Sequence, residues 1–109
     1  MTTFFISQPM NGKTDEEIKA DRRQCEAWLT KAFGSFIIID SFIAEDPPKD
    51  CKNIPAWYLG GSIKKLARAD VLVLWGDWKN ARGCLLERES AIKYGIPVIE
   101  NGGEKHESN

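Results

Sequence analysis

Histidine is almost absent from this chain, and cysteine never occurs in the close pairs that bind zinc or carry redox chemistry. The one histidine, His106, lies in a polar C-terminal stretch, whereas Ser-His-Asp and Cys-His catalysis both need a rigidly placed imidazole. The three cysteines form no Cys-x-x-Cys pair, which excludes a zinc ribbon and a thioredoxin-like motif. We therefore expect no metal and no cofactor, and carboxylates as the reactive groups of any enzyme activity.

Long apolar runs and a strong charge of one sign are missing as well. No run approaches the roughly 18 apolar residues that cross a bilayer, and the first residues show no signal-peptide pattern. The formal net charge of −1 gives no positive field for polymeric nucleic acid or an anionic membrane. These absences, with the unpaired cysteines, predict a cytoplasmic protein that binds neither polymeric nucleic acid nor membranes. The 109 residues suit one globular domain.

Short apolar segments alternate with amphipathic ones along the whole chain. A capping box, Thr14 with Glu17, begins the first expected helix, and Gly34 ends it. The expected strands are 3–7, 35–40, 70–75 and 97–100, and the expected helices are about 14–33, 55–69 and 82–94. Strict alternation predicts an α/β fold, a small three-layer sandwich with four parallel strands in the order 2-1-3-4. The domain covers residues 1–100, and 101–109 form a polar tail.

This strand order places a switch point between the first and third strands, where ligands bind beyond the carboxyl ends. The loop SQPMNGK borders that point and leads into a helix N-terminus, where backbone amides favour an anion. A simple Pro/Gly turn before a capped helix explains the same residues. The loop supplies the first group of candidate substrate-binding residues: Ser7, Gln8, Pro9, Met10, Asn11, Gly12 and Lys13.

Glu87 is the candidate catalytic residue. It shares one helical stripe with Gly83 and Ala91, whose small size leaves room for a ligand beside the carboxylate. Its place near the positive end of the helix favours the ionised form. Such a carboxylate could attack an electrophilic carbon or hold a sugar hydroxyl. The alternative is a solvated surface glutamate like its neighbour Glu89.

Several residues near the switch point are further binding candidates, each with a structural alternative. Arg82 and Lys79 could hold a phosphate or remain solvated cations, and Gly83 could let a ligand approach the helix. Trp78 could stack on a base or belong to the core, and Asp40 could bind a ribose hydroxyl or cap a turn. Without a histidine base, Cys84 is interpreted as a packed thiol, although it lies in the first turn of a helix.

Four segments occur in an order that resembles the nucleoside 2-deoxyribosyltransferase-like superfamily. They are FISQPM (5–10), ADVLV (69–73), Gly83-x-x-x-Glu87-x-x-x-Ala91 and YGIPV (94–98). The most similar branch is a group of small bacterial and phage proteins, the DUF4406 domain, which the chain resembles from residue 3 to about 99. The resemblance implies a flavodoxin-like or Rossmann-like sheet and a pocket for a nucleoside or nucleotide. It also implies that the first loop borders the pocket and helps to hold a 5′-phosphate.

The resemblance assigns a reaction as well. In the enzymes of this superfamily, the glutamate that matches Glu87 attacks the anomeric carbon of a deoxyribosyl group, and the base leaves. Water or a second base then takes the sugar. This chain differs from the enzymes at two supporting positions. Ser62 occupies a position where the enzymes often carry an aspartate, and Phe5 occupies the position of a tyrosine that steadies the nucleophile. Asp77, Asp40 and Glu45 are possible substitutes for the missing acid.

Three hypotheses follow. The first is a nucleoside or nucleotide N-glycosidase or 2-deoxyribosyltransferase with Glu87 as nucleophile. The second is a non-catalytic nucleotide-binding module that senses or sequesters its ligand, and the third is an interaction protein on the same scaffold. The expected second helix carries more apolar residues than one buried stripe needs, namely Trp57, Tyr58, Leu59, Ile63 and Leu66. Since the superfamily's members are typically oligomers, we expect a homodimer or larger homo-oligomer with this helix in the interface.

Overall fold

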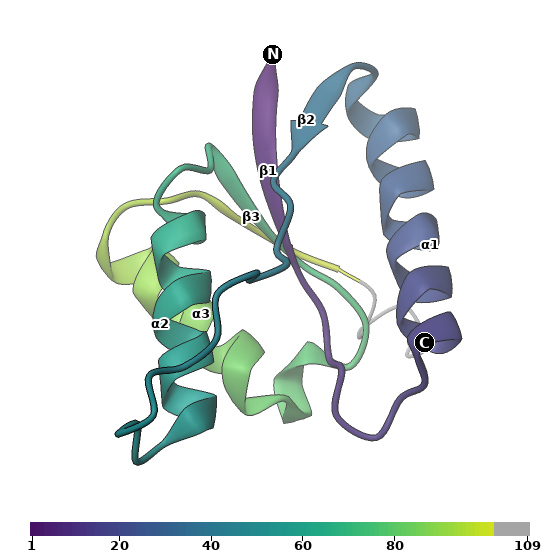
Figure 1. Cartoon of the computed structure of the whole chain (residues 1–109). Helices are drawn as coiled ribbons and strands as arrows, with labels where there is room; N and C mark the ends of the chain where they lie inside the picture. Colours follow the sequence, from purple (N-terminus) through teal and green to yellow (C-terminus); the bar gives the residue numbers. More distant parts are fainter. Residues whose placement is uncertain (102–109) are drawn as a thin grey trace.

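A computed structural model describes residues 1–101 and has an all-parallel sheet flanked by helices (Figure 1). The strand order β2-β1-β3-β4 confirms the predicted fold class. The predicted polar tail lies outside the described residues except for Asn101, whose N–H donates to the carbonyl of Leu74. The elements are β1 (Thr2–Ser7), α1 (Asp15–Phe33), β2 (Phe36–Ile38), α2 (Ile54–Leu66), β3 (Val71–Leu74), η1 (Trp78–Asn80), α3 (Arg82–Lys93) and β4 (Val98–Glu100).

The element boundaries follow from local hydrogen bonding. Thr14 and Glu17 form the predicted capping box, and Gly34, at φ 77°, ends α1. The second strand is shorter than predicted, because the Asp40 carboxylate accepts the N–H of Phe42 and turns the chain away. Within residues 1–101, no helix combines the length and the apolar character needed to cross a membrane.

Two cores lie on opposite faces of the sheet. On one face α1 packs Cys25 and Leu29 against Phe4 and Ile6 of β1. On the other face α2 and α3 cover a core that includes Phe5, and Figure 1 shows this pair across the sheet from α1. Side chains of a strand alternate between faces, so Phe5 and Ser7 both point towards α2 and α3. Burial on both faces explains why the strands read as continuous apolar runs.

The carboxyl ends of β1 and β3 meet at the centre of the sheet. Ser7 pairs in register with Leu74, and the N–H of Trp75 donates to the Ser7 carbonyl at 2.9 Å. The two following loops touch, since a Cβ on Gly76 would lie 3.5 Å from Cδ of Pro9. Ser7 and Trp75 therefore lie at neighbouring strand ends, and the site develops at this switch point.

Candidate functional site

A buried hydrogen bond between Ser7 and Glu87 is the centre of the site. Ser7 ends β1 on the side of α3 and is 3% exposed, while Glu87 lies in the second turn of α3 and is 8% exposed. The hydroxyl Oγ of Ser7 donates to Oε1 of Glu87 at 2.5 Å. Glu87 is therefore buried beside the end of β1, and the alternative of a solvated surface glutamate is wrong.

Burial controls the protonation of this site. It raises the pKa of Glu87, and the hydrogen bond from Ser7 offsets part of that rise. The neighbouring Cys84 thiol has a pKa of about 11, because burial and then the charge of Glu87 raise it, although Ser7 lowers it somewhat. A thiol with this pKa stays protonated at neutral pH, which agrees with a packed cysteine and disfavours a nucleophile.

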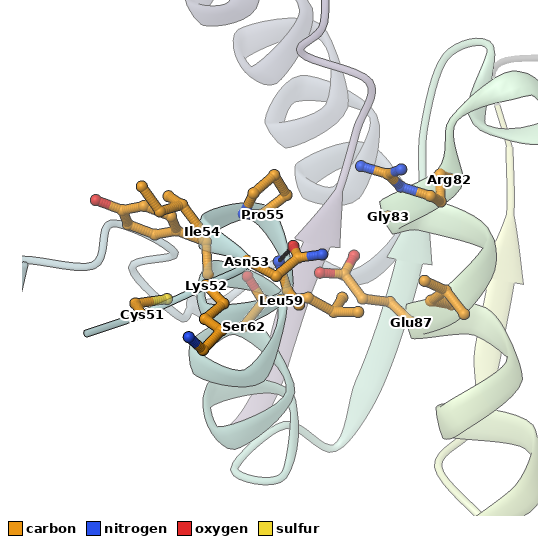
Figure 2. Close-up of a pocket in the computed structure, with 13 residues that line it drawn as sticks. Cys51, Lys52, Asn53, Ile54, Pro55, Leu59, Ser62, Arg82, Gly83 and Glu87 are labelled. Carbon is orange, nitrogen blue, oxygen red and sulfur yellow. Dashed lines mark hydrogen bonds between the residues drawn. The ribbon is translucent and has the colours of Figure 1, made fainter. Parts of the chain in front are cut away.

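Glu87 opens into a cleft of about 790 Å³ between the N-terminal halves of α2 and α3. Figure 2 shows its carboxylate directed across the cleft towards Asn53 at the start of α2. One wall is apolar, and Lys52, Asn53 and Arg82 are polar parts of the lining. The residues around the cleft are Cys51, Lys52, Asn53, Ile54, Pro55, Ala56, Tyr58, Leu59, Ser62, Arg82, Gly83, Leu86 and Glu87.

The N-terminus of α3 at this cleft has no side-chain cap. Its N-cap residue is Ala81, whereas Thr14 caps α1 and Asn53 caps α2. In the part of the chain that the structure describes, the N–H groups of Arg82 and Gly83 have no hydrogen-bond acceptor. A Cβ on Gly83 would meet no other described residue within 4 Å. Free amides and a positive dipole end therefore face open space, an arrangement that favours an anion.

Most of the predicted binding loop does not reach this cleft. Ser7 contacts Glu87, but Gln8 is buried with its Nε2 donating to the carbonyl of Ile18. Lys13 forms a 2.9 Å ion pair with Asp21 of α1, which raises the pKa of Lys13. Pro9 packs beside Gly76, and three loop residues are exposed away from the cleft lining: Met10, Asn11 and Gly12. The contacts of Gln8 and Lys13 direct the loop towards α1, and none of residues 8–13 lines the cleft.

Two other predicted binding residues have structural roles. The Trp78 ring is buried, with the Lys79 and Arg88 cations each 5.6 Å from its centroid, so no ring face is open for stacking on a base. Its Nε1 has no hydrogen-bond partner among residues 1–101. Asp40 is exposed outside the cleft lining and caps its own turn. For both residues the structural alternative is the one that the geometry supports, and Lys79 also lies outside the cleft lining.

The possible substitutes for the missing acid are not in the cleft either. The Asp77 carboxylate accepts two hydrogen bonds from the Asn80 amide, at 2.9 and 3.0 Å. Glu45 lines a separate hollow on another side of α2. Ser62, at the position where the resembling enzymes often carry an aspartate, does line the cleft with Glu87. Among the described lining residues, Glu87 is the one carboxylate.

Sequence reasoning missed the start of α2, which supplies half of the cleft, including Lys52, Asn53 and Tyr58. A signal was present, because Asn53 followed by Pro55 marks a helix start. In a parallel α/β fold, every helix that follows a strand begins at the carboxyl edge of the sheet. The starts of α2 and α3 therefore had to lie at the edge where Ser7 lies.

Comparisons with known proteins do not identify a relative. No family model, no curated protein and no solved structure matches this chain. Over residues 1–101 no cluster of three His, Cys, Asp or Glu side chains is placed to hold a metal ion. The geometry of the cleft and the motif resemblance are thus the basis for assigning a function.

Proposed function

We propose that the protein binds a nucleoside or nucleotide in the α2–α3 cleft and breaks its N-glycosidic bond through Glu87. The observation that carries this proposal is a carboxyl group, 8% exposed, that opens into a cavity of about 790 Å³. Burying an ionisable group without an ionic partner is costly, so a role at the cleft accounts for its position. The motif resemblance supplies the reaction type.

The chemistry needs one free carboxylate oxygen. Ser7 holds Oε1, and Oε2 has no hydrogen-bond donor among residues 1–101. We assign Oε2 as the atom that attacks the anomeric carbon while the carbon–nitrogen bond breaks. The bonding electrons pass to the base nitrogen, which takes a proton from water because Ser62 supplies no acid. Water then attacks the glycosyl ester, which gives the free sugar, restores the Glu87 carboxylate and releases one water proton to solvent. When a second base attacks in place of water, the sugar is transferred to that base.

The uncapped start of α3 favours a nucleotide over a nucleoside. The N–H groups of Arg82 and Gly83, together with the Arg82 guanidinium, suit a 5′-phosphate. Four residues of helix separate Gly83 from Glu87, a rise of about 6 Å. A deoxyribose fits between these two points, with the phosphate at the helix end and the anomeric carbon at Glu87. The apolar wall, with Leu59 and Leu86, suits the base.

Base release tests this proposal. We expect the wild-type protein to liberate base from at least one member of a panel of deoxynucleosides and their 5′-monophosphates. Glu87→Gln should release none, because a neutral amide cannot form the glycosyl ester. Glu89→Gln is the matched control on the same helix, since Glu89 forms an exposed pair with Lys93. Turnover by the Glu87→Gln protein would contradict the assignment of the nucleophile.

A second function, nucleotide binding without turnover, is favoured by one observation. Among residues 1–101 no second carboxylate lines the cleft to replace the aspartate, as Ser62 occupies its position, and general acids typically contribute 10²–10⁴-fold. Calorimetry distinguishes the two functions. Nucleotide binding by the wild type with no released base would support the module, whereas absence of both binding and turnover would leave an interaction scaffold.

We also propose that the protein assembles as a homodimer or larger homo-oligomer. Ile54 and Tyr58 on α2 and Leu86 on α3 are exposed and line the cleft, and Leu85 next to Leu86 in α3 is exposed as well. A second copy on this surface would cover them and close the cleft. The interface we propose is therefore the start of α2, because Leu66 is buried inside the fold. A monomer mass by light scattering at high micromolar concentration would contradict this.

The location that we propose is the cytoplasm. Cys25, Cys51 and Cys84 are all free thiols. Thiols persist in a reducing compartment and are oxidised in secretory ones. Fractionation of the source cells, with detection of the protein, tests the location directly.

A further inference from the structure

The backbone of Ser7 is held by the sheet. Ser7 is the last residue of β1, and at this position the strand pairs with β3. It lies opposite Leu74, and its carbonyl accepts the N–H of Trp75 at 2.9 Å. The hydroxyl therefore projects from the centre of the sheet, and its position does not depend on a loop.

This hydroxyl lies two residues from the position where the resembling enzymes carry a tyrosine. Phe5 occupies that position and packs in the core between the sheet and α2 and α3. Because side chains alternate along a strand, Ser7 points to the same face as Phe5, one step nearer the carboxyl edge. The chain thus lacks the tyrosine hydroxyl and has a serine hydroxyl on the same face, 2.5 Å from the glutamate.

We propose that Ser7 is a positioning residue, which locks Oε1 of Glu87 to the sheet and so makes Oε2 the attacking atom. This inference rests on the proposed function of the cleft. Ser7 is the one hydrogen-bond partner of the Glu87 side chain in the described range. Loss of the Ser7 hydroxyl leaves the carboxyl group of Glu87 free to rotate within the cleft. Since attack needs a defined approach to the anomeric carbon, rotation lowers the rate of the chemical step.

The same contact also stabilises the charged form of the glutamate. Burial raises the pKa of Glu87, and the Ser7 hydrogen bond opposes that rise. Cys84, with a pKa of about 11, remains neutral throughout the acidic range. Arg82 faces the cleft from the same helix, and three other titratable groups line it from the α2 side: Cys51, Lys52 and Tyr58. None of these is a hydrogen-bond partner of Glu87 over residues 1–101, so removal of Ser7 should act on Glu87 directly.

An NMR titration without substrate tests the coupling. The carboxyl carbon of Glu87 is followed against pH in protein labelled with ¹³C-glutamate and assigned through Glu87→Gln. We expect Ser7→Ala to raise the pKa of Glu87, and Ser7→Thr, which keeps the hydroxyl, to restore the wild-type value. Ser90→Ala is the matched control, because Ser90 lies on α3 but does not line the cleft, and its hydroxyl donates to the backbone carbonyl of Leu86. Ser7→Cys keeps the size with a weaker donor, and should give an intermediate value.

Turnover kinetics test the positioning role. In Ser7→Ala we expect kcat for base release to fall about ten- to hundredfold, the worth of one hydrogen bond to a charged group. KM should stay within about twofold, because Ser7 is not proposed to touch the substrate. The acidic limb of the kcat/KM profile should move to higher pH together with the NMR pKa. If Ser7 had only a structural role, Ser7→Ala would leave both the acidic limb of the kcat/KM profile and the pKa of Glu87 unchanged.

The possible failures are distinguishable. If the wild type releases base but Ser7→Ala leaves kcat and the pKa of Glu87 unchanged, the Ser7 proposal is overturned and the proposed function stands. If the pKa rises in Ser7→Ala but the wild type releases no base, the coupling holds, the positioning role falls, and the enzyme function is rejected. A rise in KM with kcat constant would make Ser7 a binding residue and also overturn the proposal.

Discussion

The uncapped start of α3 predicts that Ala81→Ser stabilises the protein. Ala81 is the N-cap of α3, with extended backbone angles of φ −112° and ψ 116°, but it has no side-chain oxygen. A serine hydroxyl at this position can accept an N–H from the first turn, as Thr14 does in α1. The replacement adds one oxygen atom to a half-buried side chain, so little repacking is required.

The size of the effect follows from the capping interaction. Replacing a good N-cap by alanine typically costs about 1 kcal/mol, so the reverse change should add about 1 kcal/mol to the free energy of unfolding. With an unfolding entropy of about 2.1 cal/mol/K per residue, this corresponds to about 4 °C in Tm for a chain of 109 residues.

Thermal unfolding by circular dichroism, with urea titration at 25 °C, measures both quantities. Ala67→Ser is the matched control, because Ala67 is the C-cap of α2. The backbone groups without intrahelical partners at that end of a helix are carbonyls, so a serine oxygen there finds no free N–H group to accept. It should change stability by less than about 0.5 kcal/mol. A stability of Ala81→Ser equal to or below the wild type would refute the reasoning, since the first-turn N–H groups would then already be satisfied.

Three further predictions concern protonation, packing and thiol access. Burial raises the pKa of Glu87, so its protonated form stabilises the fold at low pH, and this contribution is lost as pH rises through the raised pKa. The free energy of unfolding of Glu87→Gln, measured by urea titration, should therefore rise relative to that of the wild type between pH 4.5 and neutral pH. A difference that stays constant with pH would contradict this prediction. Gly60→Ala has open space and should gain about 1 kcal/mol, whereas Gly61→Ala should gain less, because its Cβ would lie 2.6 Å from Cδ1 of Ile43 and that side chain would have to shift; equal urea midpoints for the two variants would contradict this. In native protein the half-buried Cys51 should react with a thiol reagent well before the two buried cysteines, and mass spectrometry that found all three labelled at one rate would disprove it.

The strand order and the region of the site were predictable because they depend on local patterns. Strict alternation of apolar strands and capped helices leaves few parallel topologies. The stripe of Gly83, Glu87 and Ala91 places Glu87 on a defined face of α3. Together these patterns predict a carboxylate at the switch point, and Glu87 lies there.

The contacts made by the loops were not predictable, because tertiary packing decides them. Lys13 follows a strand at the switch point, yet its ion pair with Asp21 directs it towards α1. Residues 41–53 bring Ile43 close to Gly61 of α2, and no local sequence pattern predicts this contact. The hydrogen bond of Ser7 was missed for the same reason, since its partner is 80 residues away.

That separation of 80 residues makes the site dependent on the register of the sheet. During synthesis Ser7 emerges long before Glu87, so the two side chains cannot pair while the segment between them is still being made. The two meet only after β1 and β3 have paired, and such non-local pairing forms slowly. No single fragment that lacks either end of this span contains both partners. The hydrogen bond between Ser7 and Glu87 therefore distinguishes a correctly registered sheet from a misaligned one.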